Sequence, residues 1–100
     1  METIINKDGS KFSVTIKGRI DTVTANDFQA SIAPLMEADK PEIEIDCSEL
    51  SYTSSQGLRS FLMLQKSVNS HSGSLKLSNM QPQVKEVFDI TGFSSIIKIV

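Results

Sequence analysis

Three adjacent hydroxyl side chains, Thr53, Ser54 and Ser55, lie at the junction of two patterns within the stretch Asp46–Leu62. Alternating apolar residues precede them and a helical apolar pattern follows, so they occupy the loop where a strand becomes a helix. Backbone N–H groups in a first helical turn lack intrahelical partners, and the helix dipole is positive there. A phosphate on one of these hydroxyls would therefore meet free donors and a favourable field. The alternative is that Ser54 or Ser55 simply caps the helix, which stabilises it by about 1 kcal/mol.

Gly57 follows these hydroxyls, inside the expected first turn of the helix. Glycine in a helix costs roughly 0.5–1 kcal/mol relative to alanine, and no turn geometry requires it at this position. A bare backbone beside exposed hydroxyls permits the close approach of another molecule. The sequence therefore predicts that this loop contacts a binding partner.

The other reactive side chains argue against catalysis and metal binding. A serine nucleophile needs a positioned base and an oxyanion hole, yet the sole histidine, His71, is expected in a solvated loop at the far end of the following helix. Neither a Gly-x-Ser-x-Gly elbow nor a Gly-x-x-x-x-Gly-Lys phosphate loop is present. The single cysteine, Cys47, alternates with apolar residues and is expected in the core. We therefore expect no enzyme activity, no metal site and no cofactor.

Length and composition are those of a small globular domain. The chain has 100 residues, 39% hydrophobic and 22% charged, and we expect residues 1–100 to form a single domain. The formal net charge of −2 provides no basic surface for nucleic acid. The apolar runs are too short for membrane insertion, and no basic, apolar leader opens the chain. We therefore expect a cytoplasmic protein.

Period-two alternation indicates strands that bury one face only. Thr3–Asn6 and Lys11–Arg19 are extended runs joined by an Asp-Gly turn, which is typical of a hairpin. Residues 43–47 and 74–78 alternate in the same way, and residues 96–100 are expected to form a closing strand. Strands separated by helices usually pair in parallel, but strands covered on both faces show continuous apolar runs. The sequence thus predicts a two-layer α/β fold: a mixed, mostly parallel sheet of four to five strands, with an N-terminal hairpin and helices packed on one face.

The first helix is predicted to begin at Thr24, because Thr24 and Asp27 have the spacing of a capping box. Pro34 cannot donate a backbone hydrogen bond, so a kink or an early end is expected there. The second helix should run over residues 55–69. Its inward side chains are expected to be Leu58, Phe61, Leu62 and Val68, with Leu64 at the edge of the stripe. The third helix should begin near Pro82 and stop at Gly92.

The loop around the hydroxyls resembles the STAS domain, the fold of bacterial anti-sigma-factor antagonists. The signature of that family reads Asp-Leu-Ser, then an aromatic residue, then Asp-Ser-Ser/Thr/Ala-Gly-Leu. In this chain those places are held by Asp46-Cys47-Ser48, by Tyr52 and by Ser54-Ser55-Gln56-Gly57-Leu58. Gly18-Arg19-Ile20-Asp21 is similar to the pattern that precedes the first helix of the family, and the segment 82–92 resembles its last core helix.

This resemblance implies a site. In the family the serine two residues before the glycine is phosphorylated, which corresponds to Ser55, with Ser54 as the rival acceptor. Ser54 stands where phosphorylated members usually carry aspartate. The partner-binding residues are then expected to be Asp21, Thr53, Ser54, Ser55, Gln56 and Gly57, although Asp21 by residue type alone is a common turn residue.

The resemblance also implies a function. If the chain follows the family, the unmodified protein sequesters a kinase-type anti-sigma factor and frees the sigma factor, and phosphorylation of Ser55 by that serine kinase ends the association. The alternative is a non-switched STAS subunit that acts as a structural partner in a transporter or signalling assembly, which Ser54 fits slightly better than aspartate. Many members carry a further C-terminal helix that is absent here, so the resemblance implies either a minimal version or a surface near the closing strand that awaits a partner.

Overall fold

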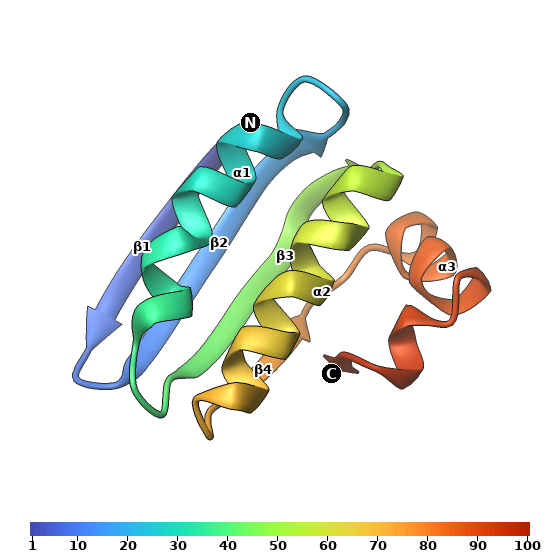
Figure 1. Cartoon of the computed structure of the whole chain (residues 1–100). Coiled ribbons are helices and arrows are strands. Elements are labelled where there is room, and N and C mark those ends of the chain that lie inside the picture. The colour runs from blue at the N-terminus through green and yellow to red at the C-terminus, as the bar shows by residue number, and fades with distance from the viewer.

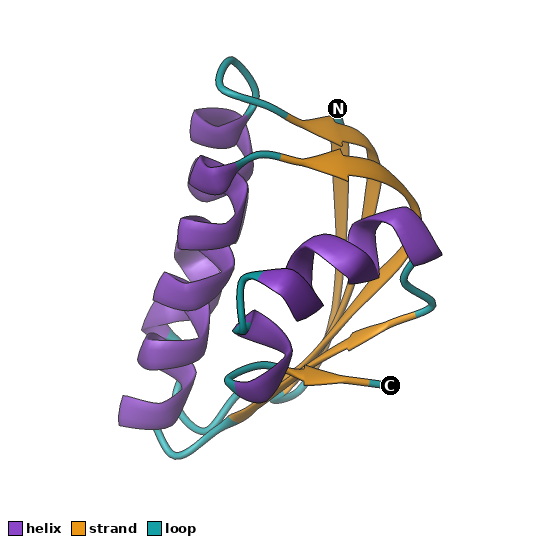
Figure 2. Cartoon of the chain, turned by 90° about the vertical axis from the view of Figure 1, so that its right-hand side faces the viewer, coloured by secondary structure: helices purple, strands orange, loops and turns teal.

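The computed structural model describes residues 1–100 and consists of a sheet and a layer of helices (Figures 1 and 2). The elements follow one another as β1 (Glu2–Asp8), β2 (Lys11–Ile20), α1 (Ala25–Ile32), the 3₁₀ helix η1 (Ala33–Glu37), β3 (Glu42–Thr53), α2 (Ser55–Ser70), β4 (Ser74–Ser78), α3 (Pro82–Ile90), the 3₁₀ helix η2 (Phe93–Ser95) and β5 (Lys98–Ile99). None of these helices has the length and apolar character needed to cross a lipid bilayer.

The five strands lie in the order β1-β2-β3-β4-β5. β1 and β2 form the predicted antiparallel hairpin, and every later pair of neighbours is parallel. Parallel neighbours need a crossover connection, and α1, α2 and α3 supply one each. The predicted mixed, mostly parallel sheet is therefore confirmed. The closing strand is shorter than predicted, since a turn at Ile96 and a bend at Ile97, which follow η2, precede β5.

The helices cover one face of the sheet and leave the other open, as Figure 2 shows. Residues on the covered face, such as Val14 in β2 and Ile45 in β3, are 1% and 0% exposed, whereas their neighbours Ser13 and Glu44 are exposed. A hollow of about 420 Å³ on the open face is lined by polar side chains that include Lys98. This hollow lies near the N-terminal ends of the parallel strands, at the opposite end from the predicted binding loop.

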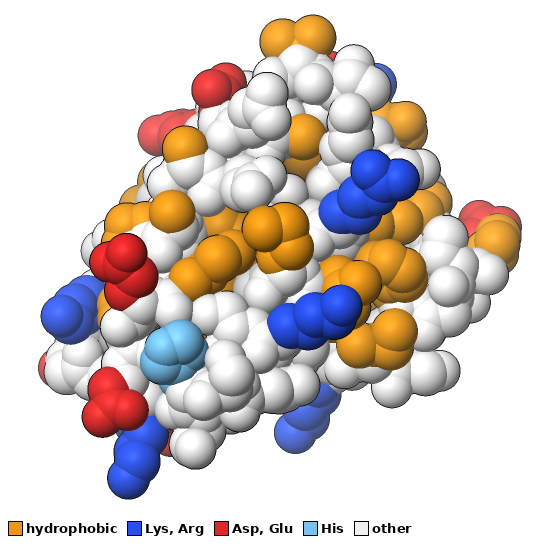
Figure 3. All heavy atoms as spheres, in the orientation of Figure 1, with side chains coloured by type: hydrophobic (Ala, Val, Ile, Leu, Met, Phe, Trp, Pro, Cys, Tyr) orange, Lys and Arg blue, Asp and Glu red, His pale blue; other side chains and the backbone are white.

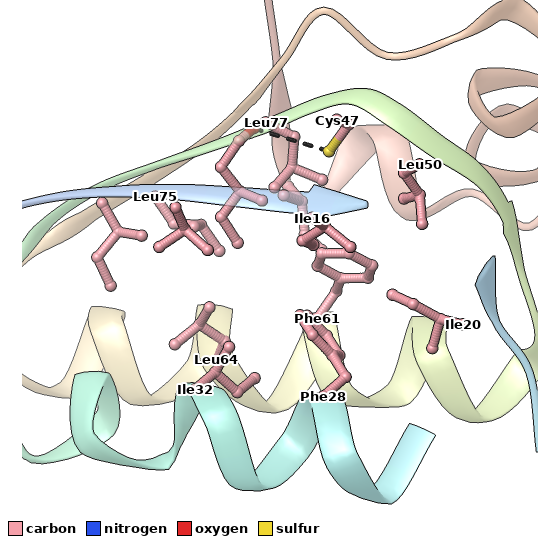
Figure 4. Packing of buried hydrophobic residues seen from close by; sticks show 14 of the residues in the cluster. Ile16, Ile20, Phe28, Ile32, Cys47, Leu50, Phe61, Leu64, Leu75 and Leu77 are labelled. Atoms are coloured by element: carbon pink, nitrogen blue, oxygen red, sulfur yellow. Dashed lines mark hydrogen bonds between the residues drawn. The ribbon is translucent and has the colours of Figure 1, made fainter. Parts of the chain in front are cut away.

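Aromatic side chains from the three helices form the centre of the core. Phe28 of α1, Phe61 of α2 and Phe88 of α3 are fully buried, with successive ring centroids 5.0 and 5.5 Å apart. The expected inward stripe of α2 needs one correction, because Leu64 is fully buried while Leu62 is only half-buried. The reason is that α1 lies alongside α2 and covers the flank that carries Leu64 (Figure 4).

The helix ends follow the local sequence. α1 stops at Ile32 and continues as the tighter η1, with Pro34 in its first turn, so the predicted interruption is confirmed. α3 begins at Pro82 as predicted. Gly92 follows it with a φ of 80°, a left-handed conformation that glycine adopts at little cost.

Cys47 lies in the core between the two layers, as predicted (Figure 4). Its side chain is fully buried in the middle of β3, and Sγ lies 3.7 Å from the carbonyl oxygen of Ile45. Burial, with a smaller contribution from the neighbouring Asp46 charge, raises the pKa of the Cys47 thiol to about 12. The thiol is therefore a protonated, apolar packing group.

Candidate functional site

The candidate site lies where two loops meet at one edge of the sheet (Figure 1). The β2–α1 loop follows Ile20 and the β3–α2 loop follows Thr53, and these two residues are register partners in the parallel pair β2/β3. The backbone N–H of Ser54 donates to the Ile20 carbonyl over 2.7 Å, which extends the pairing into the loop. The sheet therefore places Asp21, the residue after Ile20, beside the three predicted hydroxyls.

Ser54 is the N-cap of α2. Its backbone is extended, with φ −85° and ψ 174°, and its hydroxyl oxygen accepts a hydrogen bond of 3.2 Å from the backbone N–H of Gly57. This bond satisfies one of the unpaired donors of the first turn. Ser54, and not Ser55, is thus the residue that caps the helix, and its hydroxyl oxygen is engaged in the capping hydrogen bond.

Ser55 is the first residue of α2 and is exposed, as is Gln56. The Ser55 hydroxyl takes no part in the hydrogen bonding of the chain, whereas the hydroxyls of both preceding residues do. Of the three predicted hydroxyls, that of Ser55 is consequently the one that is both free and open to solvent.

Thr53 differs from its two neighbours because its side chain points inward. It is 3% exposed, and its Oγ1 donates to the carbonyl oxygen of Ser54 over 3.2 Å. The expectation of three exposed hydroxyls is therefore wrong at this residue. Thr53 is the last residue of β3, and its position in the strand directs it to the covered face of the sheet.

Gly57 has a packing role that the sequence analysis did not foresee. It is buried, and a Cβ atom built on it would overlap Thr53 Oγ1 and lie 2.7 Å from Cγ2 of Ile20. Figure 4 shows Ile20 directed from the end of β2 toward α2. No turn geometry requires a glycine here, as expected, because φ of Gly57 is not positive; packing requires it instead. The bare backbone accommodates the protein's own β2 and β3 side chains, which fixes the start of α2 against the sheet.

The β2–α1 loop is closed by its own polar groups. Asp21 Oδ1 accepts hydrogen bonds of 2.9 Å from the backbone N–H groups of Val23 and Thr24. Thr24 Oγ1 accepts from the Asp21 N–H at 2.9 Å and donates to the Arg19 carbonyl at 2.8 Å. The predicted capping box with Asp27 is wrong, because the Thr24 side chain faces back into the loop and makes no cap bond to α1.

Electrostatics agree with this loop geometry. The backbone N–H of Thr24, together with that of Val23, holds the pKa of the Asp21 carboxyl below its ordinary value. Asp21 is therefore ionised at neutral pH, and it adds a negative charge next to the exposed Ser55.

A shallow hollow of about 180 Å³ lies between α1 and α2 and begins next to Ser55. Its polar lining includes Asn26, Gln29, Gln56 and Arg59. Figure 3 shows apolar atoms at the surface between the helices on this face. Neither Gln29 nor Arg59 was expected at this surface from the sequence. Arg59 was detectable as the side chain one helical turn after Ser55, whereas the place of Gln29 depends on how α1 packs on α2.

No general base accompanies the free hydroxyl. His71 caps the opposite end of the 16-residue helix α2, where its Nδ1 lies 2.8 Å from the Ser67 carbonyl oxygen. It lies in the turn after α2 as expected, but it is half-buried there, whereas a solvated loop histidine was expected. Asp21 is occupied by its own loop. This arrangement can present a hydroxyl for modification or recognition, but it does not activate a nucleophile.

Fold and site together define a small mixed α/β domain that displays one free serine at a strand-to-helix junction. The sequence profile of the STAS domain matches residues 3–100. The anti-sigma-B factor antagonist of Bacillus subtilis is 34% identical over 95 residues, which covers 95% of this chain and 86% of that protein. The chain therefore belongs to the STAS domain family.

Solved structures agree on the fold. An anti-sigma factor antagonist from Mycobacterium paratuberculosis has a TM-score of 0.84 at 22% identity, over 98% of this chain and 83% of that one. The anti-sigma factor antagonist SpoIIAA in its unphosphorylated form has a TM-score of 0.82 at 19% identity, over 99% of this chain and 88% of that one. The phosphorylated form of SpoIIAA, from Bacillus, scores 0.75 at 18% identity and covers 99% and 91% of the two chains.

Proposed function

We propose that residues 1–100 act as one STAS domain, an anti-sigma-factor antagonist whose binding is switched by phosphorylation of Ser55. The unmodified domain sequesters a kinase-type anti-sigma factor in the cytoplasm, and the serine kinase activity of that partner then ends the association. The relative at 34% identity is named an anti-sigma-B factor antagonist, which supports the general role. The protein acts by binding and carries out no reaction of its own.

The observation that carries this proposal is the difference between the two adjacent serines. The Ser54 hydroxyl is occupied by the Gly57 N–H, and esterification of Ser54 would disturb the cap of α2. The Ser55 hydroxyl is exposed and unpaired, so a kinase can reach it without loss of a hydrogen bond within the domain. Ser55 is therefore the proposed acceptor and Ser54 the rival.

The partner surface that we propose is centred on Ser55. Asp21, Ser54 and Gln56 surround it at the surface. Thr53 and Gly57 belong to the same surface through their backbones and hold its shape from below, since both side-chain positions are buried. A phosphate adds a charge of about −1.5 to −2 at the centre of this surface, beside ionised Asp21, and it repels an acidic patch on a partner.

Phosphorylation by the cognate kinase, followed by mass spectrometry, tests the switch. Label is expected on Ser55, should persist in Ser54→Ala and should disappear in Ser55→Ala. An allosteric or interfacial coupling of typical size corresponds to roughly 5- to 150-fold weaker binding of the phosphorylated form. Ser55→Asp should bind less well than the parent, but by a smaller factor than the phosphorylated protein because it carries one charge on a shorter side chain.

A second candidate function is a non-switched STAS subunit that supports a transporter or signalling assembly. Ser54 favours it, because phosphorylated members of the family usually carry aspartate at this place. Partner capture from the native organism separates the two functions. Recovery of a serine kinase of the anti-sigma class supports the switch. Recovery of a stable assembly whose binding is the same for the parent and Ser55→Asp supports the structural role.

A further inference from the structure

Arg59 is a cation without a carboxylate partner, one helical turn after Ser55. The ion pairs of the chain join Lys17 to Glu49, Lys76 to Glu44 and Lys85 to Asp89. Arg59 is exposed and takes part in none of them. On the helix face of the molecule the basic side chains above α2 stand apart from the acidic ones (Figure 3). The guanidinium is thus free to bind an anion that arises nearby.

The spacing of the two side chains suits such a contact. Residues four apart on a helix are surface neighbours with Cβ atoms about 5–6 Å apart, and an acidic group N-terminal to a cation is the favourable order. α3 already contains a contact at this spacing, between Lys85 and Asp89 at 3.1 Å, although there the order is reversed. Guanidinium also presents a planar fork of donors that matches two phosphate oxygens.

We propose that Arg59 binds the phosphate of phosphorylated Ser55 within the same helix, as a positioning residue that orients this group and neutralises part of its charge. This inference rests on the proposed phosphorylation of Ser55. Arg59 also lines the hollow between α1 and α2. Phosphorylation therefore turns the guanidinium from that hollow toward the start of α2, so the modification changes the surface at two places.

The other charged groups on the surrounding elements do not replace Arg59. Asp21 in the β2–α1 loop and Asp27 on α1 are acidic and oppose a second negative charge on the phosphate. Arg19, at the end of β2, lies over the ring of Tyr52 with its Cζ 4.5 Å from the ring centroid. Arg59 is the cation on the first two turns of α2 itself. Its removal should therefore change the second pKa of the phosphate.

The test uses full-length protein with phosphoserine installed at position 55 by genetic encoding, so that it does not depend on any kinase. A ³¹P NMR titration then measures the second pKa of the phosphoserine, which lies near 6 without special contacts. Arg59→Gln is compared with the parent and with Arg59→Lys. Lys66→Gln is the matched control, because it removes one exposed positive charge from the same helix, about 16 Å along the helix axis from Ser55.

The phosphoserine pKa is expected to rise by about 0.3 or more in Arg59→Gln, the size that a helical ion pair produces. Arg59→Lys should give an intermediate value, and Lys66→Gln should match the parent because salt largely screens exposed charges that lie more than about 10 Å apart. Equal pKa values for the parent and Arg59→Gln, or equal shifts in Arg59→Gln and Lys66→Gln, would overturn the proposal. Failure of a kinase to label Ser55 would instead count against the proposed function and would leave this titration unchanged.

Discussion

The β2–α1 and β3–α2 loops contain similar polar residues but differ in how many of their side chains are hydrogen-bonded within the protein. In the β2–α1 loop, Asp21 and Thr24 are paired with one another and with the backbone, so the loop is satisfied internally. In the β3–α2 loop, Ser54 is paired in the same way, but the Ser55 hydroxyl has no partner. The presence of an acidic or hydroxyl side chain in a loop is therefore a weaker indication of function than the observation that such a side chain has no hydrogen-bond partner.

The difference has a structural origin. The β2–α1 loop has four residues, 21–24, before α1 begins, which gives its side chains room to fold back on the backbone. In the β3–α2 connection, the single residue Ser54 separates the strand from the helix. One residue supplies one cap, and the next residue already belongs to the helix with its side chain directed outward. The free hydroxyl therefore follows from the shortness of the connection.

The largest effect is expected at Gly57, where the short connection depends on contact without a side chain. Gly57→Val should lower the free energy of unfolding by about 3 kcal/mol, as a severe case of overpacking against Ile20 and Thr53. Gly57→Ala should cost about 1–2 kcal/mol, after the gain of roughly 0.5–1 kcal/mol in helix propensity. Denaturant unfolding measures both. Thr53→Ala combined with Gly57→Ala should be more stable than additivity predicts, and a simple sum would contradict the proposed clash.

Thr24→Val tests whether the hydrogen bonds within the β2–α1 loop stabilise the protein. The change removes a hydroxyl that bonds the Asp21 N–H and the Arg19 carbonyl while it keeps the shape of the side chain. We expect a loss of about 1.5 kcal/mol in denaturant unfolding, since two backbone groups lose their partner. Thr22→Val, at an exposed position of the same loop, is the control and should remain within about 0.5 kcal/mol of the parent.

The adjacent serines give the most direct comparison between a used and an unused hydroxyl. Ser54→Ala removes the cap of α2 and should cost about 1 kcal/mol. Ser55→Ala removes a hydroxyl without a partner and should change the stability by less than about 0.5 kcal/mol. Thermal and urea unfolding of the two variants decide the matter, and equal losses would show that Ser55 also supports the helix.

The smallest effect is expected from pH. Because its folded pKa is lowered, ionised Asp21 stabilises the fold above its unfolded pKa of about 3.9, and this stabilisation is lost as the pH falls through the folded pKa. Urea midpoints measured from about pH 5 to pH 2 should fall more steeply for the parent than for Asp21→Asn, which keeps the shape and an acceptor oxygen. Identical slopes would show that the carboxylate charge does not contribute to loop closure.

Much of the fold could be predicted from the sequence because the signals were local. Alternation in β2, β3 and β4 predicted strands with one wet face, and Pro34, Pro82 and Gly92 marked helix ends. The error in the inward stripe of α2 concerns a contact between elements. Leu64 is buried because α1 covers one flank of α2, and no pattern within α2 itself records the presence of α1.

The geometry of the candidate site was predicted to the level of the loop but not of the individual side chain. Sequence placed Ser54 and Ser55 correctly at the start of a helix, yet it treated Thr53 as exposed and Gly57 as a feature for a partner. Ile20 is the register partner of Thr53 and lies against Gly57, yet it is more than thirty residues away along the chain and reaches them only through the pairing of β2 with β3. Long-range register of this kind is invisible to periodicity.

Cys47 is a natural probe for local opening of the protein. Because the single thiol is enclosed between the sheet and the helices, a thiol reagent in native buffer can modify only those molecules in which β3 has become transiently exposed. Labelling therefore follows the opening of the strand that carries the serine loop at its end. A comparison of labelling rates for the parent and for protein carrying phosphoserine at position 55 would read out, without any engineered probe, whether the proposed modification changes the opening of the sheet.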